Sequence, residues 1–191
     1  MTANPSRWSV AFDEYLRFEL EAEERHELID GEIVAMAGAT RRHNVLCGRL
    51  HDAIRPLLGA GPRILERSDQ RLAVETERKG WVAYYPDLAV YCSDEVHAQD
   101  SDTRIHPSLL VEVTSKNTER KDRGVKLEDY QEIRTLDEYL IVSHSRCELE
   151  LWTRGAEGPD AWRREVVTRG SLRLKVGAVI DVDRLYADLP P

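Results

Sequence analysis

Two carboxylates lie in apolar runs of this chain, where an isolated charge is unfavourable. Asp87 belongs to the run 85–91 and Glu112 to the run 109–115, and both runs have the composition of buried strands. Burying a carboxylate costs several kcal/mol unless a partner compensates it. A divalent cation that prefers oxygen ligands is such a partner. If the two strands pair, we expect both acids to bind one Mg²⁺ or Mn²⁺.

A lysine is expected on the helix that follows the second run. Asp122, Lys126 and Tyr130 are spaced by four in a helix predicted over 118–133, so they share one face. The Lys126 ammonium can then project back toward the strand ends, although the same spacing also fits an ordinary surface ion pair with Asp122. Together with a cation held by two carboxylates, this lysine suits metal-dependent hydrolysis of phosphodiester bonds.

Glu27 and His43 are further candidates. Glu27 lies just before a tight hairpin turn predicted at Asp30-Gly31, where it is either an extra acid of the site or an exposed carboxylate. His43 lies on the apolar stripe of a helix that begins at Thr40. It can hydrogen-bond near the site or assist proton transfer, or it is a buried histidine with a local partner.

Composition limits the partners of the chain. Its 191 residues are 41% hydrophobic and 32% charged, and the net charge is −8. This length suits one core, so we predict a single domain over residues 1–191. Because the global charge repels phosphate, nucleic acid must contact a local basic patch. The patch that flanks the predicted metal site consists of Arg120, Lys121 and Arg123.

The three cysteines, Cys47, Cys92 and Cys147, are widely spaced and form no CxxC pair. They predict neither a disulfide framework nor a zinc knuckle, and reduced thiols indicate a cytoplasmic chain. No apolar run approaches the roughly 18 residues of a membrane-spanning helix, so we expect no membrane contact.

The predicted elements are those of an α/β fold with a strand-rich C-terminal part. The acidic segment 19–24 predicts the solvated end of a first helix. Residues 147–152 alternate with period two, which predicts a half-exposed strand. Further strands are predicted at 138–142, 162–167 and 171–174, followed by a last helix at 183–189.

The chain carries a series of three short motifs: Pro86-Asp87, Glu112-Val113-Thr114-Ser115 and Asp122-Arg123-Gly124-x-Lys126-x-x-x-Tyr130. This series resembles the Uma-type family of restriction endonucleases, in the PD-(D/E)xK nuclease superfamily, and the resemblance extends from about Phe12 to Tyr186. It implies a restriction-endonuclease-like mixed central sheet flanked by helices. It also implies a Mg²⁺-dependent nuclease in which Asp87 and Glu112 bind the metal and Lys126 is catalytic, with Glu27, His43, Asp122 and Tyr130 as accessory residues.

One position departs from the superfamily pattern. The motif lysine should lie two residues after the glutamate, where this chain has Thr114. The resemblance implies that the lysine has moved to the following helix as Lys126. Lys116, at the exit of the strand, is the rival. We favour Lys126 because it is aligned with Asp122 and Tyr130.

We therefore expect a metal-dependent endonuclease that hydrolyses DNA phosphodiester bonds. The alternative is a catalytically weak or inactive nuclease-like module that binds nucleic acid or regulates, which the negative charge favours; a third reading is hydrolysis of RNA. Cleaving both strands of a duplex favours a homodimer. The apolar contact is expected from the strand around Leu149, Leu151 and Trp152, or from Trp162.

Overall fold

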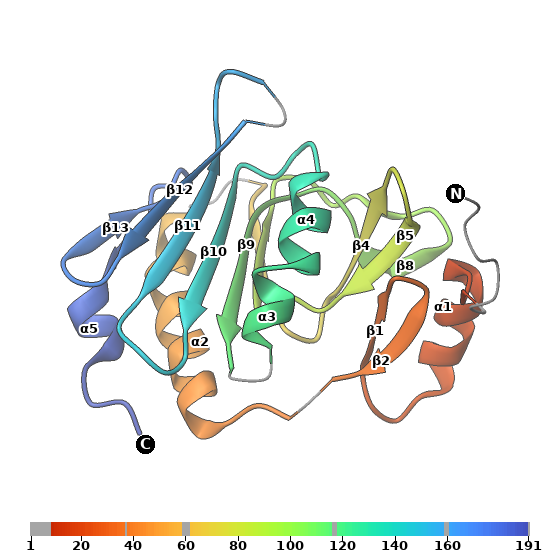
Figure 1. Cartoon of the computed structure of the whole chain (residues 1–191), viewed down its shortest axis with the longest axis horizontal. Coiled ribbons are helices and arrows are strands. Elements are labelled where there is room, and N and C mark those ends of the chain that lie inside the picture. The colour runs from red at the N-terminus through yellow and green to blue at the C-terminus, as the bar shows by residue number, and fades with distance from the viewer. Residues whose placement is uncertain (1–8, 37, 59–61, 116–117, 159–160, 191) are drawn as a thin grey trace, which may run out of the picture.

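Two six-stranded mixed sheets form the frame of the fold, and a two-stranded sheet lies near the C-terminus (Figure 1). The structure is a computed structural model that describes residues 9–36, 38–58, 62–115, 118–158 and 161–190. The strand order is β2-β1-β5-β4-β8-β7 in the first sheet and β12-β11-β10-β9-β6-β3 in the second. The predicted α/β class is confirmed, with the strands divided between two large sheets.

The bounds of the strands follow this division. The first sheet contains β1 (His26–Ile29), β2 (Glu32–Ala35), β4 (Arg71–Thr76), β5 (Gly80–Tyr84), β7 (Val96–His97) and β8 (Asp100–Arg104). The second contains β3 (Ile64–Arg67), β6 (Leu88–Tyr91), β9 (Pro107–Thr114), β10 (Glu138–Ser143), β11 (Leu149–Arg154) and β12 (Trp162–Val167). The small sheet pairs β13 (Ser171–Arg173) with β14 (Val179–Asp181).

Helices cover both faces of the second sheet. The helices are α1 (Phe12–Glu21), which packs against the first sheet, and α2 (Arg41–Ile54), α3 (Glu119–Asp122), α4 (Val125–Gln131) and α5 (Val182–Tyr186), with the 3₁₀ turn η1 (Arg55–Leu57) after α2. Figure 1 shows α2 on one side of this sheet and α3 and α4 on the other. The strands β9 and β10 are parallel, and α3 and α4 make the crossover between them.

The two faces of β9 belong to different cores. Leu109, Val111 and Val113 pack with α2, α5 and the small sheet, whereas Leu110 packs with α4 and the first sheet. Because side chains alternate along a strand, Glu112 shares the face of Leu110 and points toward α4. The apolar run therefore fixes the side on which its one carboxylate lies.

The helix predicted over 118–133 is two helices. Gly124 separates them with φ −115° and ψ −108°, outside the helical region. A Cβ at this position would lie 2.7 Å from the backbone oxygen of Arg120, so only glycine fits the break without a shift. Asp122 thus ends α3 while Lys126 and Tyr130 lie on α4, and the face they share is made by two short helices.

The hairpin predicted at Asp30-Gly31 is confirmed. Both residues have positive φ, 51° and 76°, and β1 pairs antiparallel with β2 so that Ile29 faces Glu32. This is the backbone of a type I′ turn, which aspartate and glycine favour. The hairpin places Glu27 on β1, in the first sheet.

Three predicted exposures are wrong. Glu19, in the acidic segment expected to be solvated, is 4% exposed because it accepts hydrogen bonds from the Tyr85 hydroxyl and the His26 amide. Leu149 and Leu151, expected on a half-exposed strand, are buried in the core with α2 and α5. They are therefore unavailable for the dimer contact that the alternation suggested.

Among the described helices, none is long and apolar enough to cross a membrane.

Candidate active site

Asp87 and Glu112 come together because β6 and β9 are neighbours. The two strands pair antiparallel with Leu88 opposite Val111, so the residues that come next, Asp87 and Glu112, lie side by side. Asp87 Oδ2 also accepts a hydrogen bond from the Val113 amide at 2.7 Å. The predicted pairing of the two strands is confirmed; that the two carboxylates share one cation stays a prediction.

Lys126 is buried against the acids from the helix side. Its Nζ lies 2.9 Å from Glu112 Oε1 and 2.8 Å from Glu27 Oε1, and 5.4 Å from the centre of the Tyr84 ring. Tyr130, one turn further along α4, donates its hydroxyl to the same Glu112 oxygen at 3.0 Å. The lysine therefore reaches the strand glutamate although it comes from a helix.

Glu27 is a buried member of this cluster and not an exposed carboxylate. Its Oε2 pairs with Lys121 Nζ at 2.8 Å, while Oε1 pairs with Lys126. Burial would raise the pKa of Glu27, but the charges of Lys126 and Lys121 more than offset this and hold it below its ordinary value. Since Glu27 comes from β1, the site lies where the two large sheets meet.

Asp122 completes the acidic set. It is 2% exposed, and its Oδ1 lies 4.0 Å from Lys126 Nζ. Within the described part of the chain, this oxygen has no hydrogen-bond partner. A buried carboxylate oxygen without a donor is unfavourable, which makes it a place where an additional cation is stabilised.

The cluster has more negative than positive charge. Three carboxylates, from Glu27, Glu112 and Asp122, face the ammonium groups of Lys121 and Lys126, and a fourth, from Asp87, lies near Glu112. Burial, followed by the charges of Asp122 and Asp87, raises the pKa of Glu112 against the opposing effect of Lys126. Burial lowers the pKa of Lys126, but Glu112 and Glu27 outweigh it and hold that pKa well above its usual range. Two uncompensated negative charges remain when all six groups ionise.

The donor set fits a hard divalent cation. In the described part of the chain, Asp87 Oδ1 and Glu112 Oε2 accept no hydrogen bond, since the known donors contact Asp87 Oδ2 and Glu112 Oε1. Carboxylate oxygens on neighbouring strands are the ligands that Mg²⁺ and Mn²⁺ prefer. With Glu112 and Asp122 ionised and His43 neutral, the excess of two negative charges matches the charge of one such ion. Because burial raises the pKa of both acids, a bound cation would displace protons from them.

His43 joins the site through Asp87. Its Nε2 lies 3.1 Å from Asp87 Oδ2, and its amide is bound by the Thr40 side chain, which caps α2 as expected. Burial lowers the pKa of His43, but the hydrogen bond and the charge of Asp87, together with Asn44 and Glu112, outweigh burial and leave the pKa above its ordinary value. Cys47 lies beside it, with Sγ 3.6 Å from Nδ1. Sequence reasoning missed Cys47, although its spacing of four from His43 on a helix was a usable signal.

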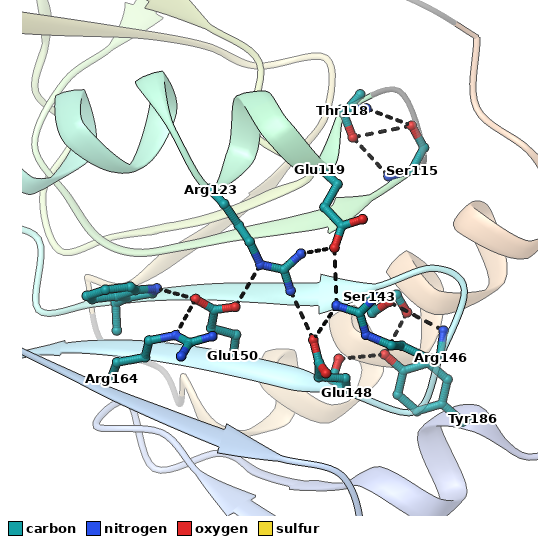
Figure 2. Close-up of polar contacts among 11 residues, drawn as sticks. Ser115, Thr118, Glu119, Arg123, Ser143, Arg146, Glu148, Glu150, Arg164 and Tyr186 are labelled. Carbon is teal, nitrogen blue, oxygen red and sulfur yellow. Dashed lines mark hydrogen bonds and ion pairs between the residues drawn. The ribbon is translucent and has the colours of Figure 1, made fainter.

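The basic patch predicted to bind nucleic acid is largely neutralised. Figure 2 shows Arg123 reaching Glu119, Glu148 and Glu150, with 3.0 Å to Glu148 and 2.8 Å to Glu150. Lys121 is paired with Glu27. Arg120 is exposed and is the member of the patch still open to solvent. The rival lysine, Lys116, lies outside the described residues.

Comparison with known proteins gives matches over most of the chain. The Uma2 family, described as "Putative restriction endonuclease", matches residues 12–183. "Uncharacterized protein slr1290" of Synechocystis sp. is 32% identical over 178 residues, 93% of this chain and 91% of that protein. "Uncharacterized protein sll1609" of the same organism is 33% identical over 135 residues, 68% of this chain and 72% of that protein.

A solved structure shares the fold. It is the crystal structure of "a putative nuclease belonging to DUF820" from Anabaena variabilis, with a TM-score of 0.73, 12% identity, and coverage of 95% of this chain and 99% of that chain. At this identity the likeness concerns the fold alone. The motifs, the family match and the near full-length relative together show that the chain belongs to the Uma2 family.

Proposed function

We propose that the chain is a Mg²⁺- or Mn²⁺-dependent endonuclease that hydrolyses DNA phosphodiester bonds. The observation that carries this proposal is the buried contact of Lys126 Nζ with Glu112 Oε1 at 2.9 Å, beside Asp87 on the neighbouring strand. Two carboxylates and one lysine suit metal-dependent hydrolysis of phosphodiester bonds, and the family that the chain belongs to is described as "Putative restriction endonuclease". Asp87 and Glu112 are assigned as metal ligands and Lys126 as the catalytic lysine.

The residues divide the work as follows. When bound, the cation supplies Lewis-acid polarisation of the phosphate and a nucleophilic water. Lys126 stabilises negative charge on the phosphate in the transition state, because its ammonium is held in a dry environment where charge interactions are strong. Tyr130 and Lys126 both bind Glu112 Oε1, which orients the carboxylate and leaves Oε2 for a ligand role. Glu27 holds Lys126 from the other sheet.

The test is a cleavage assay on duplex, single-stranded and branched DNA and on RNA, with Mg²⁺, Mn²⁺ or EDTA. We expect metal-dependent cleavage of DNA that Asp87→Asn and Glu112→Gln abolish. Glu128→Gln, an exposed carboxylate on α4, is the matched control and should cleave as the wild type does. Absence of cleavage on every substrate, or cleavage that survives Glu112→Gln, overturns the proposal.

A nuclease-like binding or regulatory module is the second candidate. The observation that favours it is the neutralisation of Arg123 by three carboxylates, which removes most of the expected phosphate-binding patch from a chain with a net charge of −8. Such a module would have a regulatory role, or would bind nucleic acid through other residues without hydrolysing it. Filter binding in EDTA separates the candidates, because binding with no turnover in any metal supports the module.

We further propose a homodimer acting on DNA in the cytoplasm. Cutting both strands of a duplex needs two sites, and a two-fold dimer supplies them with one surface. Leu149 and Leu151 are excluded from that surface by their burial, whereas the half-buried Trp152 and Trp162 remain available. Light scattering at tens of micromolar should give twice the 21.9 kDa of the chain. A mass of one chain at that concentration contradicts the dimer but leaves the nuclease assignment untouched.

A further inference from the structure

A second set of donor atoms, of softer chemistry, lies beside the acid pair. One ligand atom each from His43, Cys47 and Asp87 lies within 4.8 Å of the other two, and in the described part of the chain this is the one trio of that kind. His43 Nε2 is 3.1 Å from Asp87 Oδ2 and 3.9 Å from Cys47 Sγ. The trio is thus more compact than any grouping of three acids in the cluster.

The three donors are held by rigid elements. His43 and Cys47 are one turn apart on α2, which is anchored in the core by Leu46 and Leu50. Asp87 is fixed from the other side by the Val113 amide. A tetrahedral cation with bonds of about 2.0 Å to N and O and 2.3 Å to S separates its ligands by about 3.3–3.6 Å. The observed separations bracket this range, so small side-chain rotations bring the donors into place.

The donor types select the ion. Mg²⁺ takes hard oxygen ligands, whereas imidazole and thiolate together favour Zn²⁺, Co²⁺ and similar ions. We propose that His43, Cys47 and Asp87 bind one borderline-soft divalent cation of the Zn²⁺ class, at a site that shares only Asp87 with the pair Asp87 and Glu112. Three protein ligands leave a fourth position for water or a substrate oxygen.

The surroundings suit a cation. The side chains of His43 and Asp87 are 17% and 12% exposed, so the site is shielded but reachable from solvent. Burial, and then the charges of Asp87 and Glu112, raise the pKa of the Cys47 thiol, and the same two negative charges stabilise a cation bound beside it. Binding converts the Cys47 thiol to a thiolate, whose proton leaves to solvent as the sulfur–metal bond forms.

Cobalt(II) titration of the full chain under reducing, chelator-free conditions tests the site without any nuclease assay. A thiolate bound to Co²⁺ gives a charge-transfer absorption in the near ultraviolet, which Mg²⁺ cannot produce. We expect one Co²⁺ per chain with this band, and loss of the band in Cys47→Ser. His43→Gln should weaken Co²⁺ binding by at least about tenfold, since loss of even an outer-shell partner costs about 10–100-fold.

Matched variants separate this site from other thiols and from the nuclease proposal. Cys92→Ser and Cys147→Ser change exposed cysteines and should keep the band. Glu112→Gln removes an acid assigned to the hard-ion site and should also keep it. Absence of the band in the wild type, or its survival in Cys47→Ser, overturns the inference, whatever the cleavage assays give.

Thiol alkylation provides a check that needs no variant. With iodoacetamide and peptide mapping by mass spectrometry, Zn²⁺ should protect Cys47 while Cys92 and Cys147 react as before, and Mg²⁺ should protect none of the three. Equal labelling of Cys47 with and without Zn²⁺ contradicts the site. Protection of all three thiols contradicts it as well, because it indicates binding to exposed cysteines.

Discussion

Lys126 is the residue on which the electrostatics of the acidic cluster depend. Its ammonium contacts Glu27 and Glu112 within 3 Å and lies 4.0 Å from Asp122, and it is buried together with all three. Removing one partner of a buried ion pair leaves an uncompensated charge, which is more unfavourable than never having buried the pair. The same group therefore matters for folding and for the proposed chemistry.

Lys126→Ala should lower both turnover and stability. Loss of one stabiliser of transition-state charge reduces the rate by about 10²–10³-fold. The free energy of unfolding should fall by about 3–5 kcal/mol in EDTA, because Glu27 and Glu112 lose their shared cation. Urea unfolding and single-turnover cleavage measure the two effects. The stability loss should shrink when Mg²⁺ is added, whereas an equal loss with and without Mg²⁺ argues against a cation at the acids.

Lys116→Ala distinguishes the rival lysine. If Lys116 contacts only the backbone of the substrate, its loss weakens DNA binding modestly, and the effect fades as salt is raised because it reflects counterion release. Cleavage rates at low and high salt measure this. An inactive Lys116→Ala beside a Lys126→Ala of near-normal turnover shows that the lysines have been assigned the wrong way round.

At the scale of elements, α3 is held against the second sheet by a network of charges (Figure 2). Arg123, which directly follows α3, forms ion pairs with Glu148 and Glu150. Arg146 forms ion pairs with Glu148 and with Glu119 on α3. Glu150 accepts further hydrogen bonds from Arg164 at 2.7 Å and from the Trp152 indole at 2.9 Å. Because α3 carries Lys121 and Asp122, this network fixes one wall of the acidic cluster.

The stability of the network should fall in acid. Burial alone would raise the pKa of Glu150, but hydrogen bonds from Arg164, Arg123 and Trp152 lower it from 4.5 to about 2. A lowered folded-state pKa contributes stability above pH 4.5 that is lost as pH falls toward 2. Glu150→Gln should lose about 1–3 kcal/mol at neutral pH and flatten this dependence.

Urea unfolding between pH 2 and 7 measures the effect of Glu150→Gln. Glu165→Gln, an exposed carboxylate on β12, is the control and should follow the wild-type curve. A Glu150→Gln curve parallel to the wild type across this window contradicts the role of Glu150.

The break between α3 and α4 gives a prediction about backbone geometry. Gly124→Ala places a Cβ 2.7 Å from the Arg120 oxygen, so α4 must shift and move Lys126 away from Glu112. We expect a loss of about 1–3 kcal/mol in stability and a clear loss of cleavage. Gly48→Ala on α2 has open space at its Cβ and should instead stabilise the chain by about 0.5–1 kcal/mol. Similar thermal unfolding of the two variants contradicts the argument.

At the scale of the whole molecule, residues of the site link the two large sheets. Glu27 on β1 binds lysines from α3 and α4, and Asp129 on α4 binds Tyr84 on β5 at 2.5 Å. These contacts tie the first sheet to the helices that cross over the second. That residues 1–191 form one domain stays a prediction. If the two sheets separate on unfolding, we expect them to do so at this charged junction.

Mg²⁺ should therefore stabilise the whole chain. A cation that relieves the excess of two negative charges binds the folded state selectively, and at a concentration 100 times Kd it adds about 2.7 kcal/mol. Calorimetric unfolding with Mg²⁺ and with EDTA measures the shift. The shift caused by Mg²⁺ should be smaller in Glu112→Gln. A shift equal to that of the wild type would show that the ion does not bind at Glu112.

The sequence alone determined the local features of this protein. Apolar runs predicted β6 and β9, the Asp30-Gly31 pair predicted its hairpin, and Asp87 and Glu112 could be singled out because a charge in an apolar strand needs a partner. These signals are local, since strand burial and turn conformation depend on neighbouring residues. Lys126 followed from its helical spacing and from the resemblance to a family.

Only the tertiary structure decided which charges meet. Glu19 was expected in solvent and Glu27 was left open between the site and solvent, but both are buried, because their partners Tyr85 and Lys126 come from distant segments. Arg123 was expected to be free for phosphate, but the return of β11 beside α3 neutralises it. The hydrophobic pattern of a segment predicts the face of its own helix or strand on which a side chain lies. Its charge partner is supplied by whichever element packs opposite, and that is fixed only when the sheets and helices assemble.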